Sequence, residues 1–122
     1  MNAKENKREW ANAAAASFVR KAGSLVVDAN AKPSAKSRNR IDIVAYDVAA
    51  DCIAFCAVRT ADDMRRLCGV SRTARLALRR AGRAWARANG WRGAVRHDVI
   101  GVYGAPGELP VIDHVRNVEV CK

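Results

Sequence analysis

The side chains with the clearest chemical potential in this sequence are arginines gathered in one stretch. Between Met64 and His97 the chain carries ten arginines and no aspartate or glutamate. A guanidinium group is planar and donates two parallel hydrogen bonds to a phosphate, so arginine is well suited to bind polyanions. The stretch therefore predicts a surface that meets phosphates, and the alternative is the solvated face of an arginine-rich protein.

A helix must position most of these arginines. Ser71 is a good N-cap and Gly90 a good stop, so we predict a helix between them. At about 100° per residue, the arginines fall within an arc of roughly 140°, and the apolar side chains other than Leu76 and Ala86 fall within roughly 120° on the other side. An ordinary solvated face mixes charges, because like charges four residues apart weaken a helix. The predicted phosphate-binding residues of this helix are Arg72, Arg75, Arg79, Arg80, Arg83 and Arg87, and a basic loop adds Lys32, Lys36, Arg38 and Arg40.

Other reactive residue types give weaker signals. The cysteines are Cys52, Cys56, Cys68 and Cys121. The first two fall in a predicted strand, where four residues span about 13 Å, too far to grip one zinc ion, so we expect them to pack as small hydrophobic residues. His97 and His114 lie on separate predicted strands and are interpreted as structural or surface residues. Trp85 is expected in the core, whereas Trp91 could stack on a base or pack at the edge of the core.

The remaining pattern predicts an α/β chain in the order helix, three strands, helix, two strands. The first helix has Trp10, Ala14 and Phe18 on one face. The expected elements besides the arginine-rich helix are a helix over 4–22 and strands over 25–29, 41–46, 53–59, 97–103 and 111–118. We expect a basic loop over 30–40, a linker over 60–69 and a glycine- and proline-rich turn over 104–110 that joins the last two strands as a hairpin.

Composition limits the class of protein. A chain of 122 residues, half of them apolar, is expected to form one globular domain. Its net charge of +10 attracts polyanions such as nucleic acid or an acidic membrane surface. No apolar run approaches the roughly 18 to 20 residues of a membrane span, and the charged N-terminus does not read as a secretory signal. We therefore expect a cytoplasmic protein that does not enter a membrane.

Five sequence blocks also occur in a characteristic order. They are AAASFVRKAGSLVVDANAK, RIDIVAYD, IAFCAVRT, RHDVIGV and IDHVRNVEV. In this order and spacing the chain resembles the YraN-like family of small bacterial proteins, which belongs to the restriction-endonuclease-like superfamily together with archaeal Holliday-junction resolvases. The resemblance implies a single restriction-endonuclease-like domain over residues 1–122, with a central mixed five-stranded sheet flanked by helices and a possible metal-dependent nuclease site.

The residues at the family's catalytic positions depart from its pattern. The resemblance places the metal-binding aspartate at Asp42, the glutamate of the next strand at Ala57 and the lysine at Arg59. Two further acidic positions fall near Arg40 and Asn12. A divalent cation needs several oxygen ligands, and Ala57 supplies none. Asp42 is therefore either the remnant of a metal site or the partner of Arg40 or Arg59 in an ion pair, and Asp28, Asp62 and Asp63 are the acids that could replace the lost ligands.

These observations favour a nucleic-acid-binding protein of nuclease-like fold that is catalytically degenerate, with DNA as the favoured partner and no cofactor. The first alternative is a metal-dependent endonuclease that uses Mg²⁺ on branched or single-stranded DNA. The second is a protein-interaction module whose basic face meets an acidic partner. We see no base-reading signature, so binding is expected to be independent of sequence.

Overall fold

The computed structural model describes residues 3–33, 39–60 and 71–117. Their elements are α1 (Ala3–Lys21), β1 (Ser24–Ala31), β2 (Ile41–Asp47), β3 (Cys52–Thr60), α2 (Arg72–Asn89), β4 (Ala94–Tyr103) and β5 (Val111–Val115). The predicted order of helices and strands is confirmed. The predicted linker lies almost wholly outside the described residues, as do Lys36, Arg38, Cys68 and Cys121.

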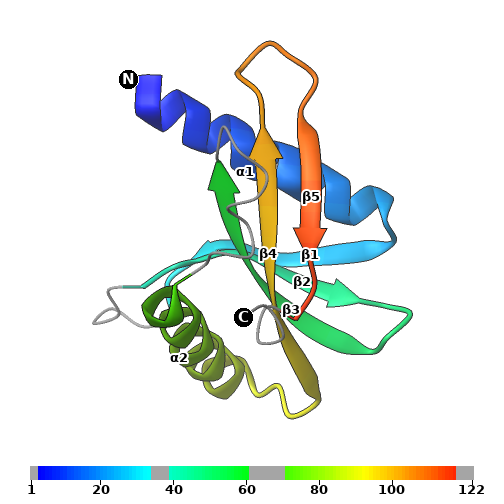
Figure 1. Cartoon of the computed structure of the whole chain (residues 1–122). Coiled ribbons are helices and arrows are strands. Elements are labelled where there is room, and N and C mark those ends of the chain that lie inside the picture. Colours follow the sequence, from blue (N-terminus) through cyan, green and yellow to red (C-terminus); the bar gives the residue numbers. More distant parts are fainter. Residues whose placement is uncertain (1–2, 34–38, 61–70, 118–122) are drawn as a thin grey trace.

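The strands form one mixed five-stranded sheet in the order β1-β2-β3-β4-β5. Neighbouring strands are antiparallel except for β3 and β4, which are parallel and are connected through α2. The two helices lie on opposite faces of this sheet (Figure 1). The central strand β3 is apolar on both sides over Cys52–Cys56, as expected for a strand covered on both faces.

The first helix packs on the sheet through small residues. Ala11, Ala15 and Val19 are the buried line of α1, and the stripe predicted from Trp10, Ala14 and Phe18 lies half-buried beside it. The predicted stripe was therefore displaced by one residue. Alanine at the contact lets the helix backbone approach the strands closely, while the large rings cover the flanks of the contact.

Three strand boundaries differ from the prediction by two residues or more. The last strand was predicted to run to residue 118, but β5 ends at Val115. We predicted that Asn30 and Ala31 begin the basic loop, but they continue β1, where Ala31 is buried and pairs with Ile41. Polar residues around them hid this pairing in the sequence, and Asn30 takes a left-handed φ of 50°, which asparagine tolerates. Strand β4 begins three residues earlier than predicted, because Ala94 to Arg96 pair in parallel with the start of β3.

Cys52 and Cys56 are buried in β3, and both are free thiols. The prediction that they pack as small hydrophobic residues is confirmed. Burial among apolar neighbours raises the pKa of both thiols, most strongly for Cys56. These two cysteines therefore contribute packing volume to the core.

Candidate nucleic-acid interface

Helix α2 separates a buried face from an arginine-bearing face. Ser71 caps its start by accepting a hydrogen bond from the Ala74 amide at 3.1 Å, and Gly90 ends it with a φ of 68°. Its buried residues are Leu78, Ala81, Gly82 and Trp85. The arginines lie on the exposed or half-buried remainder of the helix, as predicted, and no acidic residue stands in its first turn. The acid-free ridge seen in the sequence is thus a continuous feature of one helix.

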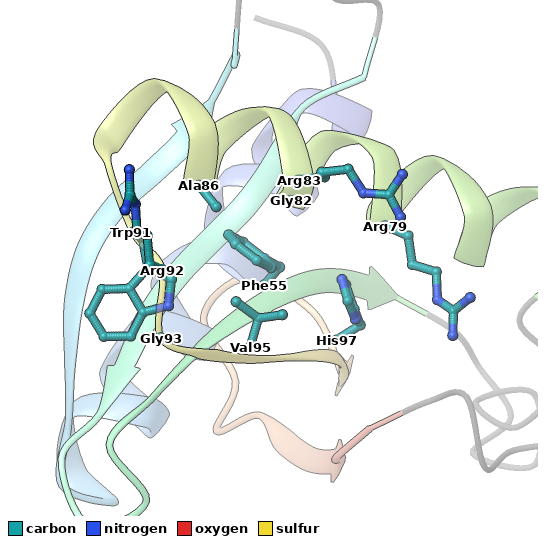
Figure 2. A pocket seen from close by; sticks show the side chains of 10 residues that line it. All are labelled: Phe55, Arg79, Gly82, Arg83, Ala86, Trp91, Arg92, Gly93, Val95 and His97. Carbon is teal, nitrogen blue, oxygen red and sulfur yellow. The ribbon is translucent and has the colours of Figure 1, made fainter.

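A groove of about 370 Å³ lies between α2 and β4 and is called here the α2–β4 groove. Figure 2 shows its side chains, which come from α2 above, from β3 and β4 below, and from the segment that joins the helix to β4. Its lining residues are Phe55, Arg79, Gly82, Arg83, Ala86, Trp91, Arg92, Gly93, Val95 and His97. Among the described residues, none that lines this groove is acidic.

The floor of the groove depends on one close helix-to-sheet contact. Phe55 of β3 packs edge-on against Trp85, with ring centroids 5.8 Å apart, and lies 5.7 Å from the His97 ring. A Cβ atom at Gly82 would lie 2.6 Å from the Phe55 ring, closer than atoms can approach. Glycine at this position therefore lets the helix sit directly over Phe55, and the groove opens along the side of that contact.

A hollow near the start of α2 extends the cationic surface beyond the α2–β4 groove. It has a volume of about 240 Å³, and its lining residues within the described part of the chain are Arg72, Arg75, Leu76 and Arg79. Arg79 lines both this hollow and the α2–β4 groove. The two together give a cationic path from the start of α2 to the groove.

The structure divides the predicted phosphate-binding residues into two groups. Arg72, Arg75, Arg79 and Arg83 line the groove or the hollow. Arg80 and Arg87 are exposed on α2 but line neither, and Lys32 is exposed at the end of β1. Arg40 is exposed before β2 and donates to the Asn30 carbonyl at 3.5 Å.

Sequence reasoning did not place Arg92 and His97 in the interface, since it interpreted His97 as structural or surface. Arg92 follows Trp91 just beyond the helix, and His97 is brought beside α2 by the parallel pairing of β3 and β4. The alternation of His97 with Val95 on one face of β4 was a usable signal, because residues two apart in a strand share a face.

A separate cleft surrounds Asp42 at the ends of β2 and β3, here called the Asp42 cleft. It measures about 350 Å³. Its lining residues are Arg8, Ala11, Asn12, Asp42, Val58, Arg59 and Thr60. The structure thus brings together three of the positions that the resemblance singled out, Asp42, Arg59 and Asn12. Ala57 does not line this cleft and packs instead near Val99 and Tyr103.

Asp42 is engaged by the protein itself. Its Oδ2 accepts a hydrogen bond from the Val58 amide at 2.8 Å, and its Oδ1 lies 3.7 Å from the Arg8 guanidinium. The β2–β3 pairing ends at Ile43 and Cys56. The Asp42 carboxylate therefore accepts from the Val58 amide just beyond the end of the paired strands. We expected Arg40 or Arg59 as the ionic partner of Asp42; the partner found in the described part of the chain is Arg8, which sequence reasoning missed because α1 is distant in sequence.

The donor set of the Asp42 cleft does not fit Mg²⁺. It offers one carboxylate, already bonded to an amide, beside the two guanidinium groups of Arg8 and Arg59. Within the described residues, no group of three or more His, Cys, Asp or Glu side chains could hold a metal ion. Asp28 does not supply a replacement ligand, because its Oδ2 accepts from the Trp85 indole at 3.0 Å. Asp62 and Asp63 lie outside the described residues.

A buried network of charged side chains lies on the opposite face of the sheet, the face that packs against α1. Asp98 is fully buried and accepts from Arg96 Nε at 3.0 Å, from His114 Nε2 at 2.8 Å and from the Asn117 amide at 2.9 Å. Arg96 also bonds Asp47 at 2.7 Å. We call these residues the Arg96–Asp98 network. It withdraws Arg96 from the cationic surface and gives His114 the structural role that the sequence suggested.

The network tunes the acidity of its members. Burial acts to raise the pKa of Asp98, but the hydrogen bonds from His114, the Asn117 amide and Arg96 outweigh it and hold the pKa below its ordinary value of 3.8. The hydrogen bond from Arg96 likewise lowers the pKa of Asp47. Both carboxylates are therefore ionised at neutral pH and bind the guanidinium between them.

Comparison with known proteins adds no assignment. No protein-family model matches this chain, and no curated protein sequence matches it. Within the described residues, no helix is long and apolar enough to cross a membrane. The functional conclusion therefore depends on the geometry of the chain itself.

Proposed function

We propose that this protein is a nucleic-acid-binding domain whose α2–β4 groove and adjoining hollow contact the phosphate backbone. The observation that carries the proposal is the convergence of Arg79, Arg83 and Arg92 with His97 on one acid-free groove. Arg79 and Arg83 project from helix α2, and Arg92 projects from the segment that joins α2 to β4. The planar fork of a guanidinium group is pre-organised, so less conformational freedom is lost for each hydrogen bond that it makes to a phosphate. The net charge of +10 adds long-range attraction for polyanions.

The same proposal includes a restriction-endonuclease-like fold of the YraN-like type with a degenerate catalytic site. The α-β-β-β-α-β-β order and the mixed five-stranded sheet support the fold. The Asp42 cleft supports the degeneracy, since Asp42 is bonded to Val58 and Arg8 and Ala57 offers no carboxylate. A cytoplasmic location also belongs to the proposal, because free buried thiols such as Cys56 are typical of that compartment.

Salt-dependent binding tests the proposal. About five phosphate contacts should give a slope near −4 in a plot of log affinity against log salt concentration. The double variant Arg79→Gln/Arg83→Gln should weaken binding and reduce that slope by about 2, roughly one for each lost contact. The matched control is Arg20→Gln/Lys21→Gln, which removes two exposed charges from α1 on the other face of the sheet.

Two outcomes would contradict it. Absence of binding to DNA and RNA at low salt would remove the function, and co-purification of an acidic protein would then favour the protein-interaction alternative. Equal weakening by the α1 control would mean that net charge, and not the groove, determines affinity.

The endonuclease alternative has its own test in the Asp42 cleft. Branched, linear and single-stranded DNA incubated with Mg²⁺ or Mn²⁺ should remain intact, because the described residues that line the cleft offer one carboxylate beside two guanidinium groups. Cleavage that disappears in Asp42→Ala would support the endonuclease alternative instead.

A further inference from the structure

The α2–β4 groove has an uncharged middle between two cationic ends. Figure 2 shows Trp91 and Arg92 at one end and Arg79, Arg83 and His97 at the other. The residues between them are Phe55, Gly82, Ala86, Gly93 and Val95. Phosphate binding alone requires only exposed cations, so the apolar middle of the groove indicates that the ligand also has a part that is not a phosphate.

The groove is large enough for more than a phosphate. Its volume of about 370 Å³ lies within the range of small-molecule pockets, roughly 300 to 1,000 Å³. Apolar and aromatic walls with a few convergent polar groups are the usual lining of such pockets. The chemical group that combines a flat apolar body with flanking negative charges is a nucleotide.

The indole of Trp91 is held in place at one end. Its Nε1 donates to the Ala94 carbonyl at 3.1 Å, and its ring meets Tyr46 edge-on with centroids 6.0 Å apart. A Cβ atom at Gly93 would lie 2.6 Å from the ring, so glycine at this position is what allows the indole to lie there. A ring fixed in this way can stack on a base without the cost of ordering it first.

The lining residues of α2 and those of β4 extend side by side over similar lengths. On α2 the lining residues Arg79, Arg83 and Ala86 follow one stripe that spans about 10 Å. On β4 Val95 and His97 share one face across about 7 Å. A single strand could therefore lie lengthwise, with one base directed into the middle and its neighbouring phosphates at the ends.

We infer that the α2–β4 groove takes one unpaired nucleotide, with its base in the apolar middle and its flanking phosphates on Arg92 at one end and on Arg79 and Arg83 at the other. This inference rests on the proposed function and narrows it to single strands or extruded bases. In a duplex the faces of the bases are covered by stacking, so a paired base cannot occupy the middle without leaving the helix.

The experiment compares two DNA molecules with the same number of phosphates. One is a twenty-nucleotide single strand that carries 2-aminopurine, and the other is a blunt ten-base-pair duplex with the same label, each strand carrying a 5′-phosphate. We expect the single strand to bind about tenfold or more tightly, the scale set by stacking one base on an aromatic side chain. We also expect 2-aminopurine fluorescence to be quenched in the single-stranded complex only.

A pair of alanine substitutions locates the base. Ala86→Leu fills the middle of the groove without changing charge, whereas Ala88→Leu makes the same change at an exposed position of α2 that does not line the groove. We expect Ala86→Leu to remove the preference for single strands and the quenching, and Ala88→Leu to retain both. Should Ala86→Leu fail to fold, Val95→Met fills the same space from the half-exposed strand side without adding an aromatic ring.

The outcomes separate the two proposals. Equal affinity for duplex and single strand without quenching would overturn the base subsite but leave phosphate binding intact. Quenching that survives both Ala86→Leu and Val95→Met would also overturn it, since the base would then lie elsewhere. Failure of both DNA molecules to bind at low salt would instead remove the proposed function.

Discussion

Asp42 is a carboxylate that is engaged by an amide and a guanidinium group of the protein itself. Its Oδ2 accepts from the Val58 amide at 2.8 Å, one step beyond the last recorded β2–β3 pair, and only 11% of its side chain is exposed. Arg8 and Arg59 stand around it where a metal site would need oxygen ligands. The residue therefore stabilises the end of the sheet.

This role predicts an ordering of Asp42 variants. Asp42→Ala leaves the half-buried Val58 amide without an acceptor, which should lower the free energy of unfolding by about 1 to 3 kcal/mol. Asp42→Asn keeps an oxygen acceptor and loses only the ion pair with the exposed Arg8, so it should cost about 1 kcal/mol or less. Urea unfolding of the variants measures both. Equal losses for the two would show that charge, and not the hydrogen bond to Val58, is what the position supplies.

At the scale of elements, helix α2 was predicted almost completely, because its limits are set by local chemistry. Ser71 and Gly90 mark its ends, and its arginine and alanine positions repeat with the helical period. Tertiary relations were not predicted in the same way. The parallel pairing that brings His97 beside α2, and the contact of Arg8 with Asp42, join segments far apart in sequence. No local pattern encodes such pairs, so the groove and the true partner of Asp42 emerged only from the structure.

The close approach of α2 to β3 predicts a cost for adding one methyl group. Alanine favours a helix over glycine by about 1 kcal/mol, but a Cβ atom at residue 82 would meet the buried Phe55 ring at 2.6 Å. Overpacking of this kind costs about 1 to 3 kcal/mol, so Gly82→Ala should destabilise the protein by about 1 kcal/mol.

Chemical denaturation of Gly82→Ala gives the net sign, and Phe55→Leu in the same background tests its cause. Removing the ring should recover part of the loss, giving a non-additive double-mutant cycle. A Gly82→Ala variant more stable than the parent would mean that α2 can shift on the sheet, and that the groove is not held by this contact.

At the scale of the whole molecule, positive charge is divided between surface and interior. Most arginines of the acid-free stretch lie on α2, but Arg96 lies between Asp47 and Asp98 and forms an ion pair with each. The α2–β4 groove and the Arg96–Asp98 network lie on opposite faces of the sheet. The arginines of the groove therefore do not compete with Arg96 for Asp47 and Asp98. Excess charge on the surface opposes folding through self-repulsion, and the buried network is positioned to offset part of that cost only while its carboxylates are ionised.

Acid should therefore weaken this protein through Asp98. Because the pKa of Asp98 in the folded state is lowered below its ordinary value of 3.8, its contribution to stability is complete above that value and is lost as the pH falls through the folded pKa. Asp47 acts in the same direction, since its pKa is lowered too. Urea unfolding between pH 6 and pH 3 should show a fall in the free energy of unfolding that begins near pH 4.

The variant Asp98→Asn tests whether this fall belongs to the network. It removes a fully buried charge from between Arg96 and His114, so it should lower the free energy of unfolding at pH 6 by about 3 kcal/mol. Its stability should then depend less on pH below 4, because the titrating group is gone. Glu9→Gln, which removes an exposed carboxylate from α1, controls for the change in net charge. If the free energy of unfolding falls as steeply below pH 4 in Asp98→Asn as in the parent, another carboxylate is responsible. Asp47→Asn is then the next variant to compare.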